Sequence, residues 1–426
     1  MKDSNKVLVI GGGGREHAII HKLKESDKVS KIYCAPGNGG IARDAECVPI
    51  GVMEFDKLVD FAKSNEIDMV MVAPDDPLAA GAVDAFENAG IRAFGPNKRA
   101  AIIEGSKAFS KDLMKKYNIP TAKYEVFSNS ADAIDYIKER DTYPIVVKAD
   151  GLALGKGVII AETFEDAEKA VHEIMDDKVF GSAGGKVVIE EFLTGPEISV
   201  LAFTDGKTIK PMVSAQDHKR AFDNDKGPNT GGMGTFSPSR IYTDELANEC
   251  MKNIFIPTMN AMNSENRTFK GVLYFGLMKT PDGVKVIEYN CRFGDPETQV
   301  VLPRLESDLF EIFDAVIDER LNEIDIKWND GAAVCVVLAS GGYPRKYQTG
   351  YPIEGLCRAE SAGALIFHAG TKADGDNILT SGGRVLGVTA VGSNLDDAIK
   401  TAYGYVDLIS FKDMHYRKDI GIKKYN

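Results

Sequence analysis

The chain has 426 residues, of which 44% are hydrophobic and 27% are charged, an ordinary balance for a globular protein. A single hydrophobic core stops growing well below this length, so we expect roughly two to four domains. The net charge of −12 argues against general binding to nucleic acid or to anionic membranes. Six cysteines without a Cys-x-x-Cys pair, no signal-peptide pattern and no long apolar span lead us to expect a cytoplasmic protein with reduced thiols.

Apolar runs alternate with helical patterns over residues 1–103, which predicts a doubly wound parallel sheet. Its strands are predicted at residues 6–10, 31–35, 68–73 and 91–94, and its helices at residues 15–24, 55–64 and 78–89. Ligands of such a sheet bind at the carboxyl ends of its strands. The loops that follow the strands are therefore the first candidates for a binding site.

A glycine run, Gly11 to Gly14, follows the first strand but fails the dinucleotide fingerprint, because Glu16 stands at the third glycine position. A nicotinamide-dependent oxidoreductase is therefore the last-ranked alternative. A glycine loop before a helix still offers free N–H groups and a helix dipole to a phosphate. With the loops at residues 36–40 and 74–78, it predicts half of a pocket for a phosphorylated metabolite, although each loop by itself is more simply a turn.

The segment from about residue 104 to 328 opens with an amphipathic helix that ends near Tyr117 and continues as a compact α/β unit. Its strands are predicted at residues 124–127, 144–149, 158–161 and 186–191, and its helices at residues 131–140 and 164–175, with Thr163 as the N-cap of the second.

One loop of this unit carries Lys148, Gly151, Gly155, Lys156 and Gly157, a composition that suits a phosphate chain. The spacing differs from a Walker A loop, and Gly157 stands where a Ser or Thr would bind the metal. Metal ligands must therefore come from elsewhere. An unpaired ammonium at the end of a buried strand is costly, so Lys148 needs a phosphate or a carboxylate as its partner.

Two further stretches suggest nucleotide and substrate contacts. The backbone at Glu190, Glu191 and Leu193 could face an adenine, and Glu197 could accept ribose hydroxyls. After that, residues 217–237 lack a regular pattern, and ordered loops longer than roughly 12–15 residues are usually functional or disordered. We expect a substrate loop there, because it mixes acidic, basic and amide side chains.

Glu288, Asn290 and Arg292 end a β-rich run. Strand side chains alternate between faces, so Glu288 and Asn290 point the same way. A carboxylate and an amide oxygen are hard ligands of the kind that Mg²⁺ takes when phosphates complete its shell. Arg292 adds a planar fork for a phosphate or an acyl phosphate. The simpler interpretation of the pattern alone is a strand that ends in a polar turn.

The segment from about residue 329 to 426 predicts a small α+β domain. Strands are predicted at residues 332–339, 365–369 and 384–391, and a helix at residues 395–408. No catalytic constellation is evident in it, so we assign it to packing and to closing the site.

Taken together, the chain resembles the ATP-grasp superfamily and, within it, the phosphoribosylamine–glycine ligases (glycinamide ribonucleotide synthetases). The resemblance covers nearly the whole chain and rests on residues 9–17, 94–96, 104–109, 147–152, 214–220, 227–234, 287–299 and 382–384. It implies an N-terminal Rossmann-like substrate-phosphate domain at residues 1–103, an ATP-grasp domain at residues 104–328 and a C-terminal α+β domain at residues 329–426. Within the ATP-grasp domain it implies a lid subdomain at about residues 122–190 that excludes water. One departure is Asp75, which stands where the family carries a Glu that is one methylene longer.

The resemblance implies an ATP-dependent carbon–nitrogen ligase of purine biosynthesis. It would join glycine to 5-phosphoribosylamine through glycyl phosphate, giving glycinamide ribonucleotide, ADP and phosphate, with Mg²⁺ or Mn²⁺. Arg292, Asp217 and Lys219 are the implied catalytic residues. Asp217 would anchor the glycine ammonium group or take a proton from the attacking amine, and sequence does not separate these roles.

The binding residues that the resemblance implies fall into three groups. The nucleotide would contact Lys107, Lys148, Gly151, Gly155, Lys156, Gly157, Glu190, Glu191, Leu193 and Glu197. The two other substrates would contact Gly13, Gly14, Arg15, Glu16, Gly37, Asn38, Asp75, Arg220, Asn229, Gly232 and Asp295. Glu288 and Asn290 would be the ligands of the metal.

Two other classes of function stay open at this stage. Another ATP-grasp ligase that acts on a carboxylate or on bicarbonate is the closest rival, and a nucleotide-binding regulatory module without catalysis is the second. We expect small-molecule partners, no nucleic acid and no membrane. We expect a monomer, and a transient handover of phosphoribosylamine from a purine-pathway enzyme remains an open alternative.

Overall fold

The structure is a computed structural model that describes residues 4–152 and 157–422. Its N-terminal part is an open parallel sheet, as the alternating pattern predicts, and its strand order is β3-β2-β1-β4-β5. The edge strand β3 was not predicted. The strands are β1 (Asn5–Gly11), β2 (Val29–Pro36), β3 (Glu46–Cys47), β4 (Met69–Val72) and β5 (Ala93–Phe94). The helices are α1 (Gly14–Leu23), α2 (Phe55–Ser64), α3 (Asp75–Ala80) and α4 (Ala82–Asn88).

The single helix expected at residues 78–89 is wrong, because two helices occupy this stretch. Gly81 separates them with φ +101°, a left-handed conformation that other residues rarely adopt. The first of the two begins at Asp75, directly after Pro74, whose fixed φ suits a helix start. Asp75 is therefore held at a helix N-terminus at the carboxyl edge of the sheet.

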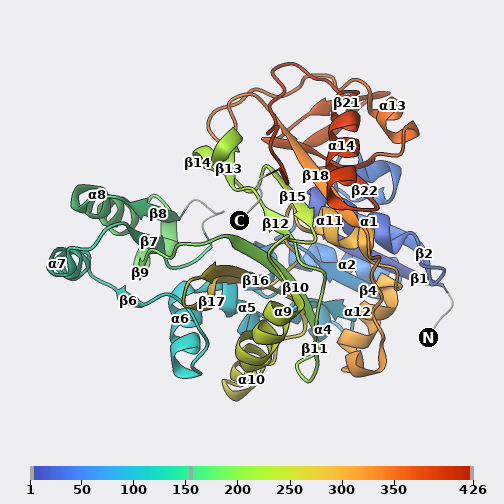
Figure 1. Ribbon diagram of the computed structural model, residues 1–426. Coiled ribbons are helices and arrows are strands. Elements are labelled where there is room, and N and C mark those ends of the chain that lie inside the picture. Colours follow the sequence, from blue (N-terminus) through green and yellow to red (C-terminus); the bar gives the residue numbers. More distant parts are fainter. Residues whose placement is uncertain (1–3, 153–156, 423–426) are drawn as a thin grey trace.

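The lid is an antiparallel sheet in the order β6-β9-β7-β8, which projects from the body of the molecule (Figure 1). Its elements are β6 (Tyr124–Phe127), α7 (Ser130–Arg140), β7 (Ile145–Ala149), β8 (Val158–Ala161), α8 (Phe164–Met175) and β9 (Val187–Glu191). It has a hydrophobic core of its own between the sheet and the two helices. The expected N-cap is confirmed, since the Thr163 side chain accepts a hydrogen bond from the N–H of Asp166.

A second antiparallel sheet, in the order β11-β10-β16-β17, forms the floor beside the lid. Its strands are β10 (Glu197–Thr204), β11 (Ile209–Pro211), β16 (Gly271–Thr280) and β17 (Gly283–Asn290). The helices around it are α5 (Lys98–Gly105), α6 (Lys107–Lys116), α9 (Asp244–Cys250), α10 (Ile256–Ser264) and α12 (Leu309–Ile317). A further helix, α11 (Thr298–Val301), packs against α1 and the sheet described next. The lid is tied to this floor where Thr121 forms a β-bridge with Val286.

The third large sheet has the order β12-β15-β18-β22-β19 and a helix, α14 (Leu395–Val406), packed against it. Its strands are β12 (Gln216–Asp217), β15 (Gly234–Ser237), β18 (Ala332–Ala339), β19 (Leu365–His368) and β22 (Arg384–Gly392). The remaining elements here are α13 (Leu356–Ser361) and the pair β20 (Thr371–Asp374) and β21 (Asn377–Thr380). Two strands of this sheet thus come from the central part of the chain.

The expectation of an irregular loop at residues 217–237 is wrong. Between β12 and β15 lies a hairpin of β13 (Arg220–Phe222) and β14 (Lys226–Asn229). Its turn places Asn224 and Asp225 at φ +59° and +54°, and Asn and Asp tolerate this conformation. The strands have only three and four residues, too few to show an alternating pattern, which is why the sequence did not reveal them.

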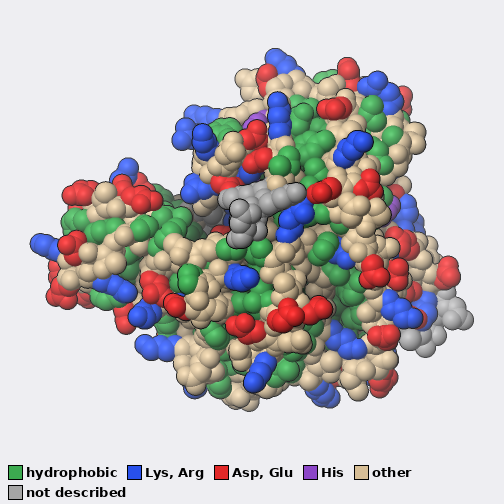
Figure 2. Space-filling model, viewed as in Figure 1, with side chains coloured by type: hydrophobic (Ala, Val, Ile, Leu, Met, Phe, Trp, Pro, Cys, Tyr) green, Lys and Arg blue, Asp and Glu red, His purple; other side chains and the backbone are tan. Residues whose placement is uncertain are grey.

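All six cysteines are free thiols. In the part of the chain that the structure describes, no helix combines the length and the apolar character needed to span a bilayer. On the face shown in Figure 2, acidic and basic side chains are interspersed instead of forming one basic surface.

Candidate active site

A cavity of about 1130 Å³ lies where the lid, the floor sheet and the C-terminal sheet meet. Strand ends and loops line it, so that side chains far apart in the sequence face one space. It receives residues from α6, β7, β9, β17, the β13–β14 hairpin and the C-terminal segment. Most of the candidate residues that the sequence indicates are among its lining.

The lid side of the cavity holds more ammonium groups than carboxylates. Lys148 at the end of β7 and Lys111 on α6 each place Nζ 2.9 Å from one oxygen of Glu190, and all three side chains are at most 5% exposed. Two ammonium groups on one carboxylate leave a net positive charge in a buried place, which favours an anion. Burial, partly offset by Glu190, lowers the pKa of Lys111 to about 8.

Lys107 and the lid loop complete this side. Lys107 donates from Nζ to the carbonyl of Gly151 at 2.7 Å, and burial lowers the pKa of this lysine. Gly151 has φ +141°, and a Cβ there would lie 2.8 Å from Cβ of Ala183, so the tight packing requires glycine. Gly157 lines the cavity, whereas Gly155 and Lys156 lie outside the described residues.

The candidate nucleotide contacts on β9 and β10 border the same space. Glu191, Leu193 and Glu197 line the cavity. The Glu191 carboxylate is occupied, since it accepts a hydrogen bond from the N–H of Lys123 at 3.0 Å. Its backbone is therefore the part that can serve a ligand.

Glu288 and Asn290 both face the cavity from β17, as strand alternation predicts. Burial alone would raise the pKa of Glu288, but Lys219 and three other cationic side chains lower it, so the carboxylate is ionised. Asn290 donates from Nδ2 to the carbonyl of Tyr289 at 2.9 Å, which leaves its Oδ1 as the atom for a ligand. Within the described ranges, no group of three or more His, Cys, Asp or Glu could hold a metal, so phosphate oxygens would have to complete the shell.

Arg292 is fixed by acidic neighbours next to this pair. Its Nη2 lies 2.8 Å from Glu104 and 3.9 Å from Asp75, and Glu104 also accepts a hydrogen bond from the N–H of Cys291 at 2.7 Å. Nε of Arg292 is buried without a hydrogen-bond partner among the described residues. Burial would raise the pKa of Asp75, but Arg292 and Arg15 lower it. The cluster is therefore charged on both sides and holds one unused donor.

A second acidic group lies at the far end of the cavity. Burial and the neighbouring Glu297 raise the pKa of Asp217 well above its usual value, although Lys219 acts in the opposite direction. Glu297 is 4% exposed and accepts hydrogen bonds at 3.1 Å from Ser199 and from Tyr274. Two carboxyl groups in a site of low polarity favour a proton or a cation, and an amine ligand would supply one.

Gly232 and Lys219 shape the surroundings of Asp217. Gly232 has φ +117°, and a Cβ there would approach Oδ1 of Asp217 to 2.8 Å. Lys219 lies 3.2 Å from Glu197 and 3.8 Å from Glu288, and the Glu197 charge is the main reason why its pKa is raised. Lys219 thus connects the acidic end with the candidate metal ligands.

The C-terminal segment was expected only to pack and to close the site, and it also contributes side chains that line the cavity. Arg384 lies with Nη2 3.1 Å from Oδ2 of Asp295 and donates from Nη1 to the carbonyl of Gly231 at 2.8 Å. Tyr343 accepts a hydrogen bond from the N–H of Gly231 at 3.1 Å. Burial would raise the pKa of Asp295, but Arg384 and Arg15 lower it.

The N-terminal loops are only partly brought to the cavity. Arg15 lines it, while Glu16 is 2% exposed and binds the N–H of Gly13 at 2.6 Å and the Arg15 guanidinium at 2.7 Å. Gly13 and Gly14 are not among the residues that line the cavity. Gly14 is packed against Gln299, since a Cβ there would meet Nε2 of Gln299 at 2.7 Å.

The loop at residues 36–40 is engaged elsewhere. Asn38 donates to the carbonyls of Gly12 at 3.0 Å and His368 at 2.8 Å, and the N–H of Gly39 donates to the carbonyl of Thr371 at 3.2 Å. Gly37 and Asn38 therefore join the N-terminal sheet to the C-terminal part and do not line the cavity.

Several residues of the site were not predicted. Lys111, Ser199 and Tyr274 read as ordinary helix or strand residues in the sequence, and burial of their polar atoms is visible only in the fold. Glu104, Glu297 and Arg384 lie in motifs that the sequence already singles out, so a closer search of those motifs could have found them.

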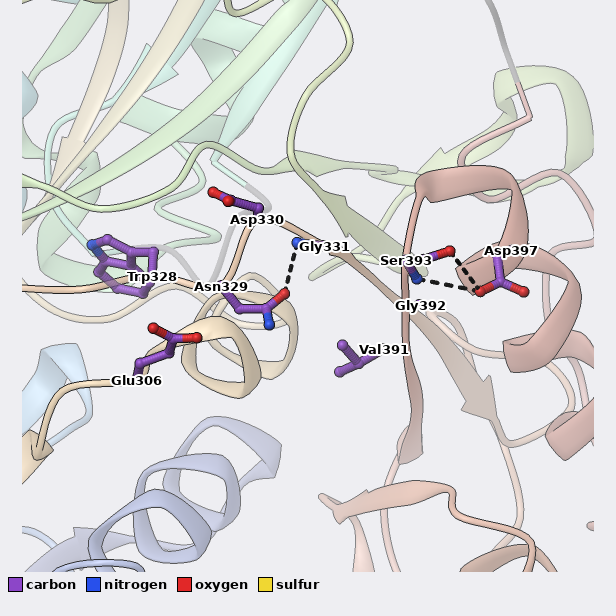
Figure 3. Close-up of a pocket in the computed structure, with 9 residues that line it drawn as sticks. All are labelled: Glu306, Trp328, Asn329, Asp330, Gly331, Val391, Gly392, Ser393 and Asp397. Atoms are coloured by element: carbon purple, nitrogen blue, oxygen red, sulfur yellow. Dashed lines mark hydrogen bonds between the residues drawn. The ribbon is translucent and has the colours of Figure 1, made fainter.

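A second hollow, of about 680 Å³, lies between residues 328–331 and 391–397 (Figure 3). Glu306, Trp328, Asp330 and Asp397 are among its lining residues, and it shares no lining residue with the cavity. The Asp397 carboxylate accepts hydrogen bonds from Ser393, next to the start of α14. None of the candidate site residues described above is among the residues that line this hollow.

Family models match three successive parts of the chain. They are described as the N domain of phosphoribosylglycinamide synthetase at residues 5–104, its ATP-grasp (A) domain at residues 105–298 and its C domain at residues 333–423.

Relatives and solved structures agree with these models. The chain is 49% identical over 419 residues to a phosphoribosylamine–glycine ligase of Clostridium acetobutylicum, covering 98% of this chain and 100% of the relative. It is 49% identical over 420 residues to one of Escherichia coli K12, covering 98% of each.

A crystal structure of the Thermotoga maritima phosphoribosylamine–glycine ligase is 32% identical with a TM-score of 0.84, covering 98% of this chain and 100% of that one. The biotin carboxylase domain of the Hydrogenobacter thermophilus 2-oxoglutarate carboxylase shares the fold at 16% identity, with a TM-score of 0.72 and coverage of 96% and 91%. The chain therefore belongs to the phosphoribosylamine–glycine ligase family, whose members are ATP-dependent ligases of purine biosynthesis built on an ATP-grasp domain.

Proposed function

We propose that this ligase forms glycinamide ribonucleotide through glycyl phosphate, with Mg²⁺ or Mn²⁺ as its metal. One observation carries the proposal most: a single cavity has an excess of lysine ammonium groups at the lid end and paired carboxyl groups at the other. Cationic side chains suit the phosphates of ATP, and carboxyl groups suit the amine of glycine.

On the lid side, Lys107, Lys148 and Lys156 would hold the phosphates of ATP. The glycines of the lid loop let its backbone approach them. The backbone from Glu190 to Leu193 would face the adenine, and Glu197 would accept ribose hydroxyls, since both stretches border the cavity.

In the first step, a carboxylate oxygen of glycine attacks the γ-phosphorus, and ADP leaves with the bridging oxygen. In the second, the amine nitrogen of 5-phosphoribosylamine attacks the carbonyl carbon of glycyl phosphate, phosphate leaves and the nitrogen loses a proton. Arg292 would stabilise charge on the carboxyl and phosphoryl oxygens, for which its unused Nε donor is suited. Asp217 would anchor the ammonium group or accept the proton. Lys219 would balance the negative charge of the neighbouring carboxylates.

The donor set of Glu288 and Asn290 fits a hard divalent cation, one ionised carboxylate and one amide oxygen facing the same space. These two residues would hold the metal together with phosphate oxygens. When bound, the metal neutralises charge on the phosphoryl group that is transferred.

For 5-phosphoribosylamine, Arg15 would face the phosphate, with Asp75 and Asp295 toward the ribosyl group. Arg220, Asn229 and Gly232 would contact the substrates from the hairpin side. Asp75 lies 3.9 Å from Nη2 of Arg292, and this ion pair would orient the shorter side chain toward the ribosyl group. We further propose that Gly13, Gly14, Glu16, Gly37 and Asn38 support this end of the site from behind.

We place the domain boundaries after residues 103 and 328, with the lid at about residues 122–190. We propose that the lid closes over ATP and protects glycyl phosphate from water. A cytoplasmic monomer suits an enzyme with free thiols and small substrates.

The test is phosphate release from MgATP with glycine, with 5-phosphoribosylamine and with both. Release only with both, and glycinamide ribonucleotide among the products, is the expected result. Release with bicarbonate instead of glycine would contradict the proposal. Isotope transfer from the glycine carboxylate oxygen to phosphate tests the acyl phosphate step separately.

A further inference from the structure

The β13–β14 hairpin needs support from other parts of the chain. Ala221 is buried, but Phe222 is 48% exposed, so the hairpin buries little apolar surface of its own. A hairpin of two strands is marginally stable in water by itself. Arg220 and Asn229 nevertheless line the cavity from this hairpin, so its position decides where they stand.

Residues 415–421, which we name the C-terminal strap, run along the back of the hairpin. The strap is joined to the hairpin by His415 Nε2 with the carbonyl of Ala221 at 2.8 Å, the N–H of Lys418 to Asp223 at 2.7 Å and the N–H of Asn224 to Asp419 at 2.8 Å. The N–H of Gly421 also donates to Nε2 of His218, two residues before the hairpin, at 3.4 Å. The strap therefore acts as the support that the hairpin lacks.

Arg417 is the centre of this connection and is 1% exposed. Its Nε and Nη2 donate to the two oxygens of Asp419, both at 2.7 Å, in the bidentate geometry that a guanidinium prefers. Its Nη1 reaches Oδ1 of Asp225 at 3.0 Å and the carbonyl of Arg220 at 3.2 Å. One side chain thus holds the first strand and the turn of the hairpin to the strap.

We propose that Arg417 is a positioning residue for the ligase reaction: through the strap, it fixes the hairpin so that Arg220 and Asn229 face glycine and 5-phosphoribosylamine. This inference rests on the proposed function, in which the hairpin side binds those substrates and the lid side binds ATP. Arg417 itself does not line the cavity. A purely structural role would lower stability and act on all three substrates alike, whereas a positioning role acts on two of them.

The experiment compares the KM for each substrate, kcat and the thermal midpoint of Arg417→Met, Arg417→Lys and the wild type. Arg417→Met should raise the KM for glycine or 5-phosphoribosylamine roughly tenfold, within the 10²-fold loss that a misplacement of ~1 Å can cause, and leave the KM for ATP within about twofold. Arg417→Lys should fall between, because an ammonium keeps the charge but loses the fork. Arg358→Met, at an exposed arginine of α13, is the matched control and should change none of these constants.

If Arg417→Met does not fold, Asp419→Asn removes one charge of the connection and keeps the shape of the side chain. An equal rise in all three KM values, or unchanged KM values in folded variants, would overturn the inference. The wild type, measured alongside, separates a failure of the proposed function from a failure of this inference. If the wild type does not consume glycine, the proposed function fails. If the wild type is active and the variants have unchanged constants, only the role of Arg417 is removed.

Discussion

The two flanks of the cavity are held in place by different means. On the lid flank, Lys111, Glu190 and Lys148 form a buried ion cluster with more positive than negative charge, which an anion would complete. On the hairpin flank, the Arg417 and Asp419 pair satisfies its own charges and holds the backbone. The charge of the lid flank is balanced only when an anionic ligand binds, whereas the charges of the hairpin flank are balanced within the protein. Charge therefore serves binding on one side and placement on the other.

Lys148→Met is the strongest test of this difference. Glu190 keeps Lys111 as a partner, so the fold should survive while the lid flank loses its excess positive charge. We expect kcat/KM for ATP to fall by about 10²–10³, the loss typical when one stabilising charge is removed from a transition state. Steady-state kinetics checks this, and a KM for glycine that rises as much as that for ATP would break the comparison.

Lys111→Met should have a smaller effect on the same flank, because Lys148 still gives Glu190 a cationic partner. Without it, Glu190 draws on Lys148 alone, and we expect the KM for ATP to rise about tenfold, or ~1.4 kcal/mol. Since burial lowers the pKa of Lys111 to about 8, its charge is lost as pH rises through that value, and ATP affinity of the wild type should fall there. Lys111→Arg should move this alkaline limb upward.

The matched control for Lys111 is Lys115→Met, one turn further along α6 at an exposed position. It removes the same charge at nearly the same distance from the lid. A similar loss of ATP affinity in both variants would indicate a general electrostatic effect and would contradict the role of Glu190 as the link.

The hairpin flank should respond to acid, and this is the smallest effect that we expect. Burial and the Arg417 charge lower the pKa of His218 to about 4, below its value of about 6.5 in the unfolded chain. Between these values the unfolded state binds the additional proton, so stability falls as pH decreases from about 6.5 to about 4 and levels off below. In the fold, Nε2 accepts a hydrogen bond from Gly421, and a proton there would oppose it.

Thermal midpoints measured from pH 7 to pH 4 check this prediction. His218→Gln keeps polar contacts and does not titrate, so its midpoint should decline less than that of the wild type over this range. Equal slopes for both proteins would show that His218 is not responsible for the acid response.

Much of the architecture could be predicted because periodicity and glycine or proline breaks are local signals. The strands at Ala332–Ala339 and Val158–Ala161 and the helix at Phe164–Met175 have the expected bounds. The hairpin at residues 220–229 could not be predicted, since its stability comes from the strap almost two hundred residues later in the chain.

The residues of the site also differ in whether local sequence signals predict them. Lys148, Glu288 and Arg292 stand at strand ends and in motifs, where the sequence shows them directly. Lys111 has no such signal, because one lysine among several on an amphipathic helix is normally a solvated residue. Lys111 reaches the site because α6 packs beside β9 in the fold. This contact joins segments far apart in the sequence, so no local pattern predicts it.

The C-terminal sheet has a consequence for dissecting this enzyme. Strand β15 pairs with β18, so a fragment of residues 333–423 would leave one edge of β18 open, and β18 is a run of eight buried apolar residues. An unpaired edge of that kind recruits other chains. Expressed alone, such a fragment should aggregate unless residues 234–237 are supplied to it, so the C-terminal part cannot be treated as a module that was simply appended to the catalytic core.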